Sequence, residues 1–295
     1  MPEQTRAVYV QPAVQPLSFR RRLTDKLMTA VAIATVLVVL APLVAIFSYL
    51  VYKGVGSINW AFLTQTPKPV GEVGGGMANA IVGSLFILAI ASIIGVPLGV
   101  GAGIYLAEFG RNRFGAAIRF TADVLNGVPS IVIGIVGYAI VVLYQKHFSA
   151  LAGGVALAIM MVPTICRTTE EMLLLVPSAL REAAYGLGVP RWRTTLSITL
   201  RTATSGVITG IMLAFARIAG ETAPLLFTTL GNQFWNVKLN QPTAALPLQI
   251  YTYGLSPYDD WHRQAWAGSL VLIIIIVGAI SAVRYVVRRG SFGTA

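Results

Sequence analysis

The sequence predicts an all-α integral membrane protein with six transmembrane helices and both termini on the same side. Hydrophobic residues make up 56% of the 295 residues and charged residues only 11%, whereas a soluble domain carries about 25% charged residues. Long apolar runs alternate with polar loops, and a run of about 20 residues is long enough to cross a bilayer as a helix. The basic residues also gather in alternate loops.

The first span is expected at Leu27–Tyr52, a run of 26 residues without a charge. This run is longer than the apolar region of a signal peptide, which is about 7–15 residues, so it predicts a membrane span rather than a cleaved leader. Residues 1–26 are mostly polar and end in Arg20–Arg22 and Lys26. This composition predicts a largely disordered basic tail.

The second, third and fourth spans each contain a proline. Ala78–Leu106 is long enough for one tilted span, or for a span with a bend at residues 95–97. The third span is expected to run from about Asp123 to Tyr144 through Pro129, and Asp123 is expected to pair with Arg119. The fourth is the compact run Leu151–Cys166.

The fifth and sixth spans flank a long outer loop. The fifth is expected from Thr202 to about Thr229, interrupted by the charges of Arg217 and Glu221. The segment Leu230–Arg263 is polar and predicts a loop, and Gln264–Val283 predicts the last span.

The distribution of Lys and Arg predicts which side of the membrane the termini face. Tails and loops on the side of the termini hold 16 of the 22 Lys and Arg residues, and those on the other side hold 5. Basic residues concentrate on the cytoplasmic side of membrane proteins. We therefore expect cytoplasmic tails at residues 1–26 and 290–295, a membrane domain at 27–289 and a cytoplasmic loop at 167–201.

The sequence lacks the motifs of covalent or metal chemistry. Cys166 is the single cysteine, so an intrachain disulfide is impossible, and His147 and His262 are too far apart in sequence for a metal motif. There is no G-x-x-x-x-G-K-[ST] motif, so the chain has no P-loop of its own. We therefore expect no catalytic residues, no metal site and no bound cofactor.

The cytoplasmic loop is expected to contain two helices joined by a sharp turn. Ser178, after a proline, is a candidate N-cap for a short helix at Leu180–Leu187. Gly188 is expected to end that helix, and a second helix at Trp192–Leu200 leads into the membrane. A helix this short is not stable alone, so it either packs on its own bundle or docks to a cytoplasmic partner.

Two charges lie within the fifth apolar run. Arg217 and Glu221 are four residues apart, so on one helix they would share a face. A charge near the middle of a membrane helix costs roughly 2.5–3.5 kcal/mol. Either the two form an ion pair that locks this helix to a neighbour, or Arg217 lines the path of an anion. A guanidinium suits phosphate or sulfate because it donates two parallel hydrogen bonds, but charge alone does not discriminate between them.

The cytoplasmic loop resembles a motif of ABC importer permeases. The residues Glu182-Ala183-Ala184, Gly188, Ile198 and Leu200 match the pattern E-A-A-x3-G-x9-I-x-L-P, and Arg201 stands where the pattern ends in proline. In that superfamily this loop holds the coupling helix. The resemblance implies that Glu182, Ala183, Ala184 and Gly188 form the contact with a separate ATPase subunit and the turn that presents it.

Four other runs are similar to PstA-type permeases of phosphate ABC importers: Gly74–Ser84, Gly103–Arg111, Met161–Gly188 and Ala216–Trp235. They are distributed along residues 71–270, within a core of resemblance at 71–287. The resemblance implies a type I importer permease fold in a bacterial inner membrane and a substrate path that includes Arg217, Glu221 and Thr222. It implies four partners: a homologous PstC-type permease, a PstB-type ATPase dimer that binds ATP and Mg, a periplasmic PstS-type phosphate-binding protein, and the lipid bilayer.

The sequence supports three other functions less well. A permease for another oxyanion would need the same arginine chemistry. A stand-alone secondary transporter or channel for an anion has no use for the E-A-A loop and would be expected to show broken helices in matching halves. A membrane-bound enzyme would need a nucleophile and base or a metal site.

Overall fold

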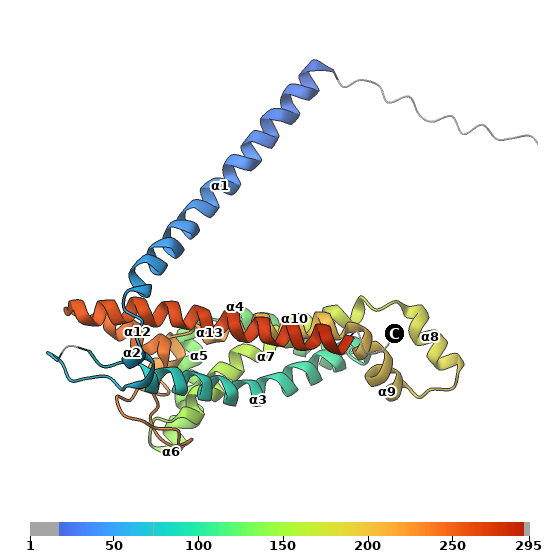
Figure 1. The fold of residues 1–295 in the computed structure, drawn as a ribbon. Coiled ribbons are helices and arrows are strands. Elements are labelled where there is room, and N and C mark those ends of the chain that lie inside the picture. Colours follow the sequence, from blue (N-terminus) through green and yellow to red (C-terminus); the bar gives the residue numbers. More distant parts are fainter. Residues whose placement is uncertain (1–17, 73, 292–295) are drawn as a thin grey trace, which may run out of the picture. The chain divides into compact units, whose positions relative to one another are not determined.

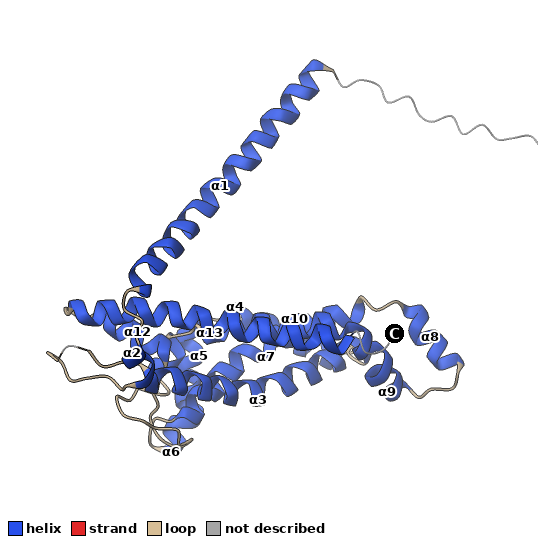
Figure 2. Cartoon of the chain, in the orientation of Figure 1, coloured by secondary structure: helices blue, strands red, loops and turns tan. Residues whose placement is uncertain are grey.

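The structure, a computed structural model, describes residues 18–72 and 74–291; in that part helices are joined by loops and there is no strand beyond isolated β-bridges (Figure 2). It contains five helices long and apolar enough to cross a membrane, and a sixth span if one bent helix pair is counted as one. The predicted all-α membrane architecture is confirmed. The described residues up to Tyr49 and those from Leu50 onward form two compact units.

The first span starts earlier than the sequence predicts. Helix α1 (Phe19–Val55) begins eight residues before Leu27 and continues through Pro42. Arg20–Arg22 and Lys26 therefore lie on a helix and not in a disordered tail, because Arg and Lys are good helix formers. Residues 1–17 of the expected tail lie outside the described residues.

Helices α3 (Ala78–Glu108) and α7 (Ala150–Leu174) pack against each other at the centre of the second unit. Glycines recur at every fourth position on the face of α3 that lies closest to α7. A Cβ atom on Gly99 would lie 2.7 Å from Ile165 Cβ, and a Cβ atom on Gly103 would lie 2.5 Å from Thr169 Cβ. Small residues allow this close approach of membrane helices. Helix α3 is continuous through Pro97, so the single-span alternative is the correct one.

The third crossing differs from the prediction of one span. It consists of α4 (Arg113–Gly127), α5 (Ser130–Gly137), the π-helix η1 (Tyr138–Val142) and α6 (Leu143–Gln145). Its axis bends by 109° between the segments Arg113–Gly127 and Ser130–Gln145. Pro129 explains the break, because a proline disfavours helical backbone in the residue before it, and Val128 is extended.

The ends of the fourth and fifth spans also move. Helix α7 continues past Cys166 to Leu174, so part of the expected polar loop is helical. The fifth span runs without interruption from Arg191 to Ala219 through α9 (Arg191–Thr194), the π-helix η2 (Thr195–Thr199) and α10 (Leu200–Ala219). It therefore ends ten residues before Thr229.

The remaining helices mark the two ends of this unit. The loop helices α8 (Ser178–Gly186) and α9 lie at one end, together with the carboxyl end of α13 (Asp259–Ser291). Helices α2 (Trp60–Thr64), α6 and α12 (Leu246–Gly254) lie at the other end (Figure 1). Residues 292–295 of the expected carboxyl-terminal tail lie outside the described residues.

Candidate functional site

Arg217 lies on an exposed face of α10, in its last turn. The next residue, Ile218, is 1% exposed and belongs to a core cluster with Ile87, Leu157 and Leu225. Because Ile218 faces this core, the helix presents Arg217 away from it. Arg217 forms no ion pair with any other described residue of the chain.

Arg217 and Glu221 do not share a helix face, contrary to the sequence-based expectation. Helix α10 ends at Ala219 with Gly220 as its C-cap, and the Glu221 amide bonds the Ile218 carbonyl oxygen in a turn. Thr222 then begins the short helix α11 (Ala223–Leu226). Gly220 ends α10 before Glu221, because glycine weakens helices, so the two charges are not on one helix. The ion pair that would lock this helix to a neighbour is absent between these two residues.

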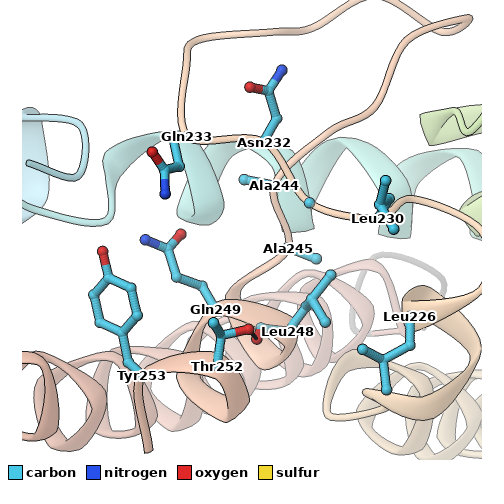
Figure 3. A pocket seen from close by; sticks show the side chains of 11 residues that line it. Leu226, Leu230, Asn232, Gln233, Ala244, Ala245, Leu248, Gln249, Thr252 and Tyr253 are labelled. Atoms are coloured by element: carbon cyan, nitrogen blue, oxygen red, sulfur yellow. Dashed lines mark hydrogen bonds between the residues drawn. The ribbon is translucent and has the colours of Figure 1, made fainter. Parts of the chain in front are cut away.

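A cavity of about 320 Å³ adjoins the end of α11. It is lined by Leu226 of α11, by the loop after it and by α12. The polar ends of Gln233, Gln249 and Tyr253 lie on one side of it, and Asn232 points away from them (Figure 3). Burial raises the pKa of the Tyr253 hydroxyl, and the Gln249 side chain partly opposes this. Tyr253 therefore stays neutral and can donate a hydrogen bond.

This cavity was not predicted, because Leu230–Arg263 was expected to be a polar loop. Instead, α12 folds back into the protein: Leu246 is fully buried and Tyr253 is 4% exposed. The Ser84 hydroxyl of α3 accepts a hydrogen bond of 2.6 Å from the Leu246 amide. The apolar run from Ala244 to Leu248 was the available signal for a buried segment.

The short helix of the loop at 167–201 is α8, Ser178–Gly186, which begins two residues before and ends one residue before the predicted Leu180–Leu187. Its N-cap is Pro177, and Ser178 makes no capping bond, so that expectation was wrong. Its carboxyl end is a Schellman motif: the Gly188 amide bonds the Tyr185 carbonyl, and the Val189 amide bonds the Ala184 carbonyl. Gly188 has a φ of 77°, which favours glycine.

The E-A-A residues divide between the two faces of α8. Glu182 and Ala183 are exposed, whereas Ala184 is 3% exposed and faces the chain's own α9 and η2. Only the first two can therefore touch another protein directly. Ala184 allows α8 to lie close to the helices beneath it.

A network of charges joins α4 to α7 near the same end. Glu170, with a side chain 4% exposed, pairs with Arg119 at 2.6 Å and with Arg167 at 2.8 Å. Asp123 lies 3.0 Å from Arg167, so its expected pairing with Arg119 was wrong. Arg119 also donates hydrogen bonds to the Leu106 and Gly110 carbonyl oxygens. These lie at the carboxyl end of α3, where a positive charge is stabilising.

Comparison with known proteins identifies the class of protein that this fold and these residues define. The model of the family described as "Binding-protein-dependent transport system inner membrane component" matches residues 95–291. The chain therefore belongs to this family of inner membrane transport components.

The relatives of the chain are more specific. It is 48% identical over 258 residues to "Phosphate transport system permease protein PstA" of Yersinia pestis, covering 87% of this chain and 88% of the relative. It is 45% identical over 259 residues to the protein of the same name from Haemophilus influenzae, covering 87% and 91%. The resemblance to PstA-type permeases that the sequence suggested is confirmed.

A solved structure supports the fold. The chain is similar to one described as "Inward facing conformations of the MetNI methionine ABC transporter: CY5 native crystal form", with a TM-score of 0.54 and 16% sequence identity. The similarity covers 72% of this chain and 94% of that chain. It confirms the ABC importer permease fold.

Proposed function

We propose that the chain is the transmembrane permease subunit of an ATP-driven importer of inorganic phosphate and forms half of its translocation path. Similarity to phosphate transport permeases over 87% of the chain supports this substrate class. The observation that carries the proposal is the position of Arg217. Its charge lies on an exposed face of a membrane span, and Arg217 has no ion-pair partner among the described residues. Such a charge is costly in lipid and marks a transport path.

Arg217 would bind phosphate through its planar guanidinium, which can donate two parallel hydrogen bonds to one oxyanion. Glu221 and Thr222 lie just beyond the end of the same helix, and both are partly buried. In this proposal they line the same path as Arg217. The other half of the path belongs to a homologous PstC-type permease.

The energy comes from a separate PstB-type ATPase dimer, which binds ATP and Mg. The exposed Glu182 and Ala183 of α8 meet the ATPase, and Gly188 forms the turn that presents them. Ala184 supports this surface from inside. This chain itself is non-catalytic and binds no cofactor.

The membrane orientation follows from the basic residues, 16 of which lie on the side proposed to be cytoplasmic. The carboxyl end of α13 lies at the same end as α8, which agrees with this arrangement (Figure 1). A periplasmic PstS-type protein would deliver phosphate at the opposite end. A Leu187→Cys variant tests the orientation, because Leu187 is 83% exposed and the native Cys166 is buried. Labelling from the outside of intact cells would refute it.

The function is tested by uptake of radiolabelled phosphate in cells that express the chain with its transporter partners. We expect uptake to need the ATPase, to resist excess sulfate and to be abolished by Arg217→Gln while the complex still assembles. Arg217→Lys keeps the charge but not the planar fork, so we expect it to recover only part of the uptake. Normal uptake by Arg217→Gln would refute the role of this residue.

Two alternatives have distinct outcomes in the same experiment. If sulfate or another oxyanion competed fully, the chain would still be a permease, but its substrate would not be phosphate. Uptake that continues without any ATPase would indicate a stand-alone anion transporter or channel, and it would remove the role given to α8.

A further inference from the structure

The inner face of α8 holds a charged residue that the E-A-A motif does not include. Arg181 precedes Glu182, but its side chain is only 19% exposed. It lies on the same side of the helix as Ala184, three residues later, which is buried against α9 and η2. Arg181 therefore points into the chain and not toward a partner.

Arg181 contacts the ends of two different spans. Its Nη2 atom lies 3.1 Å from the Oε1 atom of Glu108, the last residue of α3. The same nitrogen donates a hydrogen bond of 2.8 Å to the carbonyl oxygen of Leu173, in the last turn of α7. Glu108 is 11% exposed, so solvent screens this pair much less than a surface pair.

The two helices that Arg181 contacts form one packed unit. The glycines of α3 allow its backbone to lie directly against α7, as described above. Near their carboxyl ends, Arg119 bonds the Leu106 carbonyl of α3 and pairs with Glu170 of α7. A force applied at Glu108 and Leu173 therefore moves both helices together.

A polar cavity of about 480 Å³ lies beside this contact. It is lined by Glu108 and Arg181 themselves, by Arg111 after α3, and by Glu182 and Arg191 of the loop. The space is large enough for the Arg181 side chain to follow a shift of α8 without a clash.

We propose that Arg181 is a positioning residue for transport: it ties α8 to the joined ends of α3 and α7 and passes a displacement of α8 into these two spans. The inference rests on the proposed function, in which an ATPase moves α8. It adds the specific link through which that movement reaches the path. Glu108 and the Leu173 carbonyl are the other members of this link.

The test is the number of phosphate ions transported per ATP hydrolysed by the complete importer in proteoliposomes. We expect Arg181→Gln and Glu108→Gln each to lower this ratio about tenfold, because each breaks the ion pair that joins α8 to α3 and leaves one largely buried charge without its partner. Arg181→Lys can still reach both oxygens with one ammonium group and is expected to recover most of the ratio. The exchange Arg181→Glu with Glu108→Arg is expected to recover part of it, because the bond to Leu173 is lost.

A matched control is Arg263→Gln, which breaks the exposed Arg263–Asp260 pair of 3.0 Å in another part of the chain. We expect it to leave the ratio unchanged. An unchanged ratio in Arg181→Gln would overturn the inference, and so would release of the ATPase from that variant, because Arg181 would then act in docking. If the wild-type importer moves a different oxyanion, the proposed substrate fails, and the same ratio measured for that ion still tests Arg181.

Discussion

Replacing Gly188 by alanine tests the proposal that the turn at Gly188 presents α8 to an ATPase. Gly188 has a φ of 77°, and a Cβ atom there would meet nothing within 4 Å. The substitution therefore adds backbone strain without a steric clash. An L-residue in this left-handed region costs roughly 1–2 kcal/mol. Relief of the strain would break the two Schellman hydrogen bonds that hold the turn.

Gly186 provides a matched control within the same turn. It lies in the helix with ordinary backbone angles, and a Cβ atom there also meets nothing within 4 Å. Gly186→Ala adds the same methyl group and should stabilise α8 by up to about 1 kcal/mol. Asparagine tolerates the left-handed region better than alanine, so Gly188→Asn should lie between wild type and Gly188→Ala.

The measurement is the apparent Kd of the purified ATPase for the permease pair in detergent or nanodiscs. A cost of 1–2 kcal/mol corresponds to a loss of affinity of roughly 5–30-fold for Gly188→Ala. Gly186→Ala should bind at least as well as wild type. Equal binding by Gly188→Ala and Gly186→Ala, with both proteins folded, would refute the argument that the turn at Gly188 presents α8.

Three further substitutions test the packing, each by thermal unfolding in detergent. Glu170→Gln should destabilise by about 1.5–3 kcal/mol, since Arg119 and Arg167 lose their hydrogen bonds to a shared carboxylate but keep their other partners; an unchanged Tm would show that Glu170 adds no stability. Gly103→Leu should lower the free energy of unfolding by at least about 1–3 kcal/mol, because its Cβ would lie 2.5 Å from an atom of α7. The control Gly101→Leu should fold normally, because a Cβ there has nothing within 4 Å. Similar losses of stability in both variants would contradict the close approach of α3 and α7. Asn112→Ala removes the side-chain cap of α4, a bond of 2.7 Å to the Gly115 amide, and should cost about 1 kcal/mol; no loss would mean that solvent replaces the cap.

The spans could be predicted from the sequence because the backbone in a bilayer must satisfy its own hydrogen bonds. A charge-free run such as Leu27–Tyr52 has little choice other than a helix. The ends of the spans could not be predicted in the same way. Arg20–Lys26 and Arg167–Leu174 extend the helices into polar sequence, where hydropathy gives no signal but the hydrogen-bonding pattern simply continues.

The pairing of charges was the weakest part of the prediction. Sequence spacing suggested Asp123 with Arg119 and Arg217 with Glu221, since residues four apart are neighbours on one helix. The actual partner of Asp123 is Arg167, on another helix. Such partners depend on how helices pack, which a single sequence does not contain. For Glu221 the reason is local, because Gly220 ends the helix first.

In the E-A-A loop, the sequence pattern predicted the elements but not which residues are exposed. The pattern located α8 and the turn at Gly188 correctly. It did not distinguish the exposed Glu182 and Ala183 from the buried Ala184, because a motif lists residues and not the faces they occupy. Arg181, which lies within the same loop, is visible as important only from its contacts.

The π-helix at Thr195–Thr199 lies between α8 and Arg217 in the chain. A π-turn holds one residue more than an α-turn, and each residue in an α-helix turns the chain by about 100°. Deleting one residue from this segment would restore a regular helix from Arg191 to Ala219. Because the π-turn absorbs its extra residue, Arg217 and the end of α8 would keep nearly the same relative directions, whereas deleting one residue within α10 before Arg217 would turn Arg217 by about 100° relative to α8.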